Sequence, residues 1–210
     1  MTLRQPHSGE RLRTLDVSML APGGFGYRSL MWWGTLGLIA IEGTMFALAI
    51  GAYFYLRTRN PYWPPQGIAP PDLKWGTLNL FVLLASAVPN ELAKKAAAHV
   101  DLGLVRLWLV VALLFGVAFN AIRVMEFMTL NVTFSNDAYG SIVWLLLGLH
   151  TVHIATDVVD TGVLAALMFV GPVEEQRFVD VEENAVYWYF VVFTFLPIYG
   201  VIYWAPRIIS

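Results

Sequence analysis

The 210-residue chain contains no cysteine and has few charged residues. Without a thiol it forms no disulfide, thiolate-bound copper site, iron–sulfur cluster or covalently attached haem c. Charged residues make up 13% of the sequence, where soluble domains average about 25%, and 58% of the residues are hydrophobic. Together with a mean hydropathy of +0.62, this indicates an integral membrane protein. The net charge of −2 gives no reason to expect nucleic acid as a partner.

Long apolar runs predict an all-α membrane protein, because each exceeds the roughly 9–11 residues of a membrane strand. We expect a bundle of five transmembrane helices at residues 29–56, 75–93, 105–127, 139–170 and 185–204. Residues 1–28 form a polar N-terminal segment without the apolar run of a cleavable signal peptide, and residues 205–210 form a short tail. Lysine and arginine are more frequent on the side of the N-terminal segment. This favours a cytoplasmic N-terminus and a periplasmic C-terminus.

Two of the connections have an unusual composition. Residues 57–72 are rich in proline, which predicts a stiff, extended loop. Residues 171–183 are rich in aspartate and glutamate, which favours a solvated acidic loop or, alternatively, a docking surface for a basic partner.

Glu42 is the one charged residue in the first span. A charged carboxylate at that depth costs roughly 2.5–3.5 kcal/mol on insertion scales, so a chain that keeps one usually gives it a partner. We expect Glu42 to be a neutral, hydrogen-bonded acid that faces protein or a bound polar group, because desolvation favours the uncharged form. A structural or lipid-associated role and a proton-handling role are both open.

The fourth span carries polar residues at spacings of three, four and three, namely His150, His153, Asp157 and Asp160. On a helix these positions share one face, which must point into the bundle or toward another polar surface. Asp157 lies one turn beyond His153, where an imidazolium–carboxylate pair can form. Two histidines on one helix face cannot bind opposite sides of one haem. We therefore expect structural histidines and no metal or haem site.

Two further groups of residues point to helix packing. Small residues repeat every four positions in the first span, at Gly43, Ala47 and Gly51, a spacing that lets another helix approach closely. Near the end of the third span, Asn120, Arg123 and Glu126 lie on one side.

Several short motifs follow one another in a specific order: Trp63-Pro64-Pro65 with Gly67-Ile68, Leu78-Asn79, residues 82–86, Glu126, Tyr139-Gly140-Ser141, residues 148–153, and Tyr187-Trp188. Their order and spacing resemble subunit III of the haem-copper respiratory oxidases, in a short five-span form. The resemblance implies an accessory subunit of a proton-pumping oxidase in a bacterial inner membrane, with no catalytic residue and no cofactor of its own. The haem and copper would lie in partner chains. The chain would pack against subunit I, in a complex with subunit II and others.

The resemblance also implies a lipid role, with phospholipid held in a cleft. The residues expected in the lipid-binding or intramembrane polar network are Glu42, Glu126, His150, His153, Asp157 and Asp160. The chain departs from the family pattern in its last span, where Tyr189 and Val192 replace a histidine and an aspartate, and at Asp157, where the family often has glycine.

These departures leave alternatives open. One is a subunit-III-like accessory protein of a nitric oxide reductase. Another class is a small proton-coupled transporter that uses Glu42 and the fourth-span stripe, although the inverted repeats usual in transporters are not visible in the sequence. The electron donor, cytochrome c or quinol, is not encoded in this chain, because the donor sites lie in other subunits.

Overall fold

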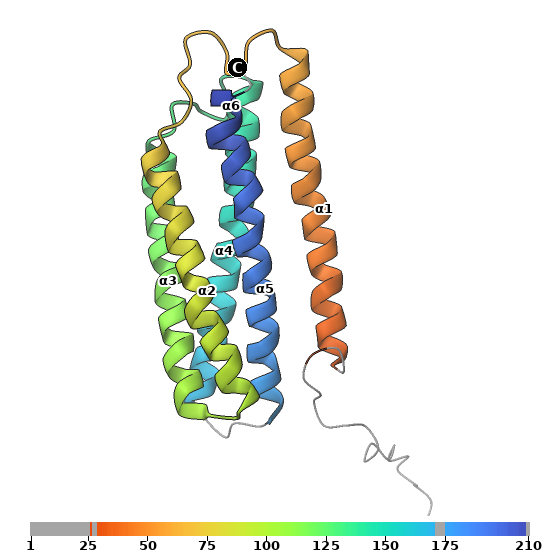
Figure 1. The fold of residues 1–210 in the computed structure, drawn as a ribbon, viewed down its shortest axis with the longest axis vertical. Helices are drawn as coiled ribbons and strands as arrows, with labels where there is room; N and C mark the ends of the chain where they lie inside the picture. Colours follow the sequence, from red (N-terminus) through yellow and green to blue (C-terminus); the bar gives the residue numbers. More distant parts are fainter. Residues whose placement is uncertain (1–25, 27–28, 171–174, 209–210) are drawn as a thin grey trace, which may run out of the picture.

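The computed structural model of the chain describes residues 26, 29–170 and 175–208. These residues form five long helices, α1 (Leu30–Arg59), α2 (Leu73–Ala98), α3 (Leu102–Met128), α4 (Ala138–Phe169) and α5 (Glu175–Tyr199), which run alternately up and down the bundle (Figure 1). α5 continues through a π-helical turn, η2 (Gly200–Trp204), into α6 (Ala205–Ile208). All five long helices are long and apolar enough to cross a membrane, and the described residues contain no strand. The prediction of a five-span all-α fold is confirmed.

The acidic stretch before the fifth span is the main departure from the expected boundaries. α5 begins at Glu175 instead of residue 185, so the prediction of a loop up to residue 183 is wrong for its described part. Glutamate is a good helix former, and two acids of this stretch have partners on other elements. Glu183 accepts a hydrogen bond from the Ser29 hydroxyl at 2.9 Å, and Glu182 lies 3.7 Å from the Lys94 ammonium. Residues 171–174, and the N-terminal segment apart from Gly26, lie outside the described residues.

Short polar side chains begin the first four helices. Ser29, Asp72, Asp101 and Asp137 occupy the N-cap positions and accept hydrogen bonds from backbone amides in the first turn. Such caps satisfy N–H groups that have no partner within the helix. The proline-rich connection after α1 is held against the bundle, because Trp63 packs edge-on against Tyr139 with ring centroids 5.1 Å apart.

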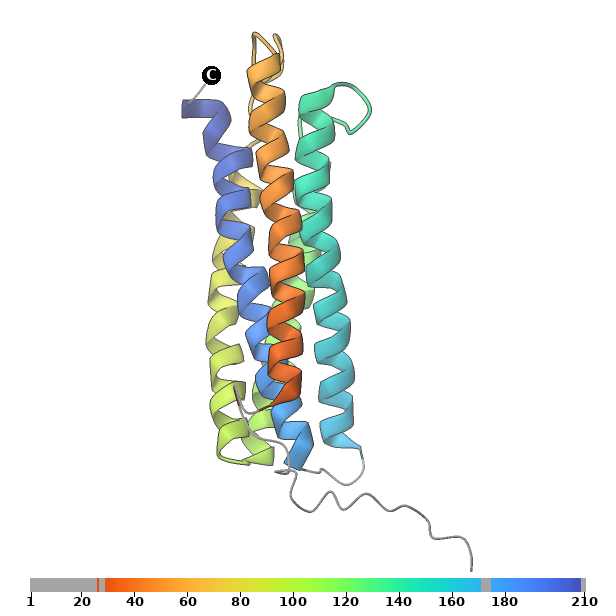
Figure 2. The ribbon, with the colours of Figure 1, turned by 90° about the vertical axis from the view of Figure 1, so that its right-hand side faces the viewer.

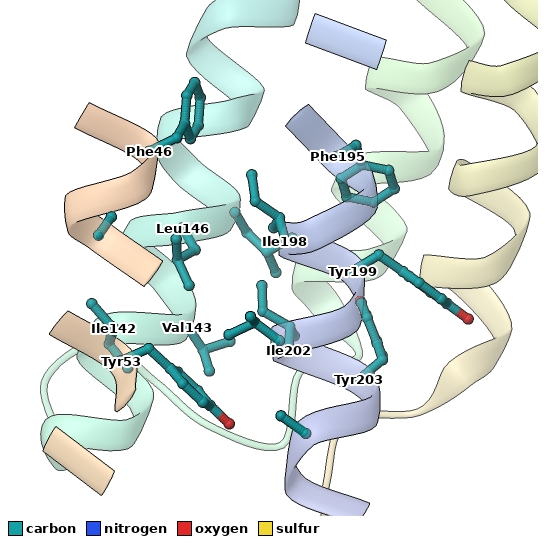
Figure 3. Packing of buried hydrophobic residues seen from close by; sticks show 14 of the residues in the cluster. Phe46, Tyr53, Ile142, Val143, Leu146, Phe195, Ile198, Tyr199, Ile202 and Tyr203 are labelled. Atoms are coloured by element: carbon teal, nitrogen blue, oxygen red, sulfur yellow. The ribbon is translucent and has the colours of Figure 1, made fainter. Parts of the chain in front are cut away.

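The helix α1 lies on one side of the bundle, packed mainly against α4 and α5 (Figure 2). Its buried residues are Phe46, Ala49 and Tyr53, and the rest of its surface is largely exposed. The main hydrophobic core joins these residues to α4 and to the C-terminal half of α5 (Figure 3). Two polar groups of side chains interrupt the apolar interior, one between α1, α4 and α5 and one between α2, α3, α4 and η2.

Candidate functional site

Glu42 lies half-buried where α1 meets α4 and α5. The Tyr187 hydroxyl of α5 donates a hydrogen bond of 2.7 Å to Oε2 of Glu42. The other carboxyl oxygen, Oε1, lies 3.7 Å from Nε2 of His153 on α4. One acidic side chain thus connects three helices, and it faces protein groups.

The protonation of His153 is constrained by its second ring nitrogen. Nδ1 lies 2.6 Å from the Leu149 carbonyl oxygen, which only accepts, so Nδ1 carries a proton and donates it. Nε2, which faces Glu42, then has two possible states. It is unprotonated if Glu42 is a neutral acid, and it is protonated if Glu42 is a carboxylate. Both arrangements leave the pair without net charge. The 3.7 Å separation between Nε2 and Oε1 is too long for a hydrogen bond, so His153 and Glu42 do not share the proton in this structure.

The spacing-based expectation that His153 pairs with Asp157 is wrong. No hydrogen bond or ion pair among the described residues joins them, because His153 turns toward Glu42 instead. Asp157 is buried, and its Oδ1 accepts a hydrogen bond of 3.3 Å from the side-chain amide of Asn184 on α5. The same amide lies 3.4 Å from Oδ2 of Asp160, which is exposed at its edge of the helix. The second oxygen of Asp157, Oδ2, has no hydrogen-bond partner among the described residues.

A cleft of about 540 Å³ opens beside this group of residues, between α1, α4 and α5. Its acidic lining consists of Glu42, Asp157, Asp160, Asp180 and Glu183. Its apolar lining includes Met31, Leu38, Val163, Leu164 and Leu167. We call it the acidic cleft. It runs from the start of α1 and α5 to the depth of Glu42, so it combines a charged interior with an apolar wall.

A second polar network lies in the opposite half of the bundle. Arg123 and Glu126, one helical turn apart on α3, are each only 1% exposed, and their charges meet with Nη1 and Oε2 at 3.0 Å. Glu126 also accepts hydrogen bonds from the Asn79 amide of α2, at 2.7 Å, and from the Tyr203 hydroxyl of η2. The Tyr203 ring can reach this position because it packs on Gly76, where any side chain would overlap it.

His150 belongs to this second network. Its Nδ1 lies 3.2 Å from Nη2 of Arg123, which only donates, so Nδ1 accepts and carries no proton. Its Nε2 therefore carries the proton and donates it to the Val191 carbonyl oxygen at 3.0 Å. The neutral ring is fixed in one tautomer. The guanidinium of Arg123 also stacks between the rings of Phe119 and Phe195, each with its centroid 4.7 Å away. The whole network is electrically neutral and ties four helices together.

The fourth-span stripe is therefore divided between the two networks. His150 points to α3, whereas His153, Asp157 and Asp160 lie toward α1 and α5. Among the described residues, Asn120, which shares a side of α3 with Arg123, bonds only its own helix, at the Gly116 carbonyl.

The small-residue face of α1 is only partly covered by the described residues. A methyl group on Gly43 would lie 3.6 Å from the Phe190 ring, and one on Gly51 would meet nothing within 4 Å. Gly43 and Ala47 line an apolar groove of about 480 Å³ between α1 and α5. Most of this face is therefore open to a neighbouring chain or to lipid.

Sequence reasoning missed Tyr187 and Asn184 as parts of the network. The predicted fifth span begins at residue 185, so Asn184 falls just outside it. The useful signal was their i, i+3 spacing, which places two polar side chains on one face of an apolar helix. Among the described residues, no three His, Asp or Glu side chains converge closely enough to hold a metal ion.

Comparison with known proteins places these features in one family. The family model described as "Cytochrome c oxidase subunit III" matches residues 27–206. The chain is 23% identical to "Cytochrome c oxidase subunit 3" of Synechocystis sp. over 87% of this chain and 79% of the relative. It is 24% identical to the protein of that name from Thermostichus vulcanus, over 83% of this chain and 87% of the relative. The corresponding protein of Tachyglossus aculeatus aculeatus is 30% identical over 80% of this chain and 67% of the relative.

Proposed function

The chain belongs to the cytochrome c oxidase subunit III family, and we propose that it supports the catalytic subunit of its oxidase by direct helix contact and by holding lipid. It is an accessory subunit of a haem-copper oxidase and a multi-pass membrane protein. The single observation that carries this function is the family match across 27–206, which includes all five long helices. A nitric oxide reductase partner and a transporter activity are not favoured.

The architecture supports a stabilising role. The network of Arg123, Glu126 and His150 pairs its buried charges inside the bundle: the guanidinium meets the Glu126 carboxylate, and both ring nitrogens of His150 have partners, while Nε of Arg123 has no hydrogen-bond partner among the described residues. These contacts link α2, α3 and α4 to one another and make this part of the bundle rigid. We place the haem and copper in partner subunits, as the family resemblance implies.

The outward face of α1 is the surface we propose for subunit I. Gly43, Ala47 and Gly51 form a smooth strip on this face, and the apolar groove next to it has no polar lining apart from Thr194. Within a membrane, helices associate through close packing of small residues rather than through hydrophobic burial. A helix of subunit I that lies along this strip would cover the part of α1 that α4 and α5 leave exposed.

The acidic cleft is the surface we propose for phospholipid. Its apolar wall suits an acyl chain, and its volume falls in the usual range of ligand sites, roughly 300–1,000 Å³. Met31, Asp180 and Glu183 of its lining lie in the first turns of α1 and α5, near the membrane surface where lipid headgroups gather. The relatives from Synechocystis sp. and Thermostichus vulcanus support a location in a bacterial inner membrane.

Purification of the tagged chain from its own membranes in a mild detergent tests the function. We expect it to co-purify with chains that carry haem and copper and with oxygen-reducing activity, while the chain purified alone shows no Soret absorption. Haem retained at one per chain, or recovery with a nitric oxide reductase in place of an oxidase, would contradict the proposal. Reconstitution of the chain alone into vesicles tests the transporter alternative, for which solute uptake would be required.

A further inference from the structure

Among the described residues, the lining of the acidic cleft carries acids without cations. Five carboxyl groups line it, and no described lysine, arginine or histidine is among its lining residues. Glu42 has His153 at 3.7 Å, and the one hydrogen bond of the Tyr187 hydroxyl among the described residues also goes to Glu42. The acids on the α4 side of the cleft have only the single amide of Asn184.

Asp157 is the group that points to a ligand. Its side chain lines the cleft, the residue is only 3% exposed, and its Oδ2 has no hydrogen-bond partner among the described residues. The two amide hydrogens of Asn184 can serve Oδ1 of Asp157 and Oδ2 of Asp160, and the Thr161 hydroxyl donates to the Asn184 amide oxygen at 3.3 Å. None of these groups reaches Oδ2 of Asp157, and a buried carboxyl oxygen left without a donor is costly.

The chemistry of the missing donor follows from this arrangement. A metal ion needs several ligands that converge, and no such cluster occurs among the described residues. A ligand that presents only an anionic group to these acids, such as free phosphate or a carboxylate, would be repelled. An ammonium group carries three N–H donors and a positive charge, so it can bond the free oxygen of Asp157 and still reach Asp160. Leu164 and Leu167 offer an apolar wall for the carbon chain that carries such a group.

We propose that the acidic cleft binds an organic ammonium group, held by Asp157 and Asp160. The same chemistry is found in the ethanolamine headgroup of a phospholipid and in a soluble aliphatic diamine. The inference rests on the proposed lipid role only if the source is the lipid, since a soluble amine would bind whether or not lipid does.

Native mass spectrometry of the full chain, released from an uncharged detergent, tests the proposal. The chain is titrated with phosphatidylethanolamine and with phosphatidylglycerol of identical acyl chains, and 1,6-diaminohexane is then added as a competitor. We expect phosphatidylethanolamine to bind at least about tenfold more tightly, because only it supplies charged N–H donors. Displacement by the diamine identifies the soluble amine as a sufficient ligand. Binding of the lipid without displacement by the diamine identifies the headgroup as the source.

Two variants and a control make the test specific. Asp157→Asn removes the charge without changing the shape and is expected to abolish most of the preference, and Asp160→Asn, at an exposed position, provides a second variant with little risk to folding. Glu91→Gln, an acid on α2 outside the cleft, should leave the preference unchanged. Equal binding of the two lipids by the unaltered chain would overturn the inference and leave the lipid role intact. A preference that survives both aspartate variants would also overturn it.

Discussion

The buried charges of Arg123 and Glu126 allow a quantitative test of how this bundle is held together. Asn79 and Tyr203 bond different carboxyl oxygens of Glu126, so the amide oxygen in Glu126→Gln keeps one of these two hydrogen bonds, and the change removes the charge and the other bond. Arg123, only 1% exposed, then has no countercharge. Removal of one partner of a buried ion pair typically costs about 3–5 kcal/mol, and we expect a loss of that size in the free energy of unfolding.

A double-mutant cycle isolates the interaction energy between Arg123 and Glu126 from the effects of each substitution on other neighbours. Arg123→Met keeps a long apolar side chain between Phe119 and Phe195 but leaves Nδ1 of His150 without its donor. That loss occurs in both the single and the double variant, so it cancels in the cycle. We expect the double variant to be less destabilised than the sum of the singles by about 2–3 kcal/mol.

Unfolding of the purified chain in detergent, followed by circular dichroism during denaturant titration, measures these values. Glu91→Gln is the control, because Glu91 and Lys95 form a similar pair at 3.3 Å with both side chains well exposed. An exposed pair contributes about 0–1 kcal/mol, so this variant should be nearly neutral. Losses at Arg123 and Glu126 that add within about 0.5 kcal/mol would refute the coupling that the structure implies.

Three further predictions concern α1 and its contacts. Glu42→Gln should preserve assembly and turnover if the acid is structural, since the amide oxygen still accepts the hydrogen bond from Tyr187. Slower proton uptake with intact assembly, measured in oxidase vesicles, would instead indicate that Glu42 handles protons. His153→Leu should destabilise the complex more when Glu42 is present than in the Glu42→Gln background, and equal effects in thermal unfolding would show that the two do not interact. Ala47→Phe should release the chain from its oxidase during mild detergent purification. Leu48→Phe, at an exposed position on the same helix, serves as the control. Unchanged co-purification of the Ala47 variant would mean that the small-residue strip of α1 meets only lipid.

The order of the spans was predictable because each is a long apolar run, and a buried helix in lipid must satisfy its backbone hydrogen bonds internally. The importance of Glu42 and of the fourth-span residues was predictable for the same reason, since polar groups at membrane depth are costly. The start of α5 was not predictable from hydropathy. Its first turns are acidic, and they are helical partly because Glu182 and Glu183 find donors on Lys94 and Ser29, which are remote in sequence.

The choice of partners was decided only by the tertiary structure. Helical spacing places His153 and Asp157 one turn apart, but it does not say which neighbouring helix offers a closer group. The packing of α1 and α5 brings Glu42 to His153 and Asn184 to Asp157. In the same way, His150 joins Arg123 because α3 lies against that edge of α4. The sequence alone determined which residues must be satisfied inside the membrane, because desolvation depends on depth and residue type. Helix packing decided which partner satisfies each of these residues, because hydrogen bonds require particular atoms to lie within about 3 Å of one another.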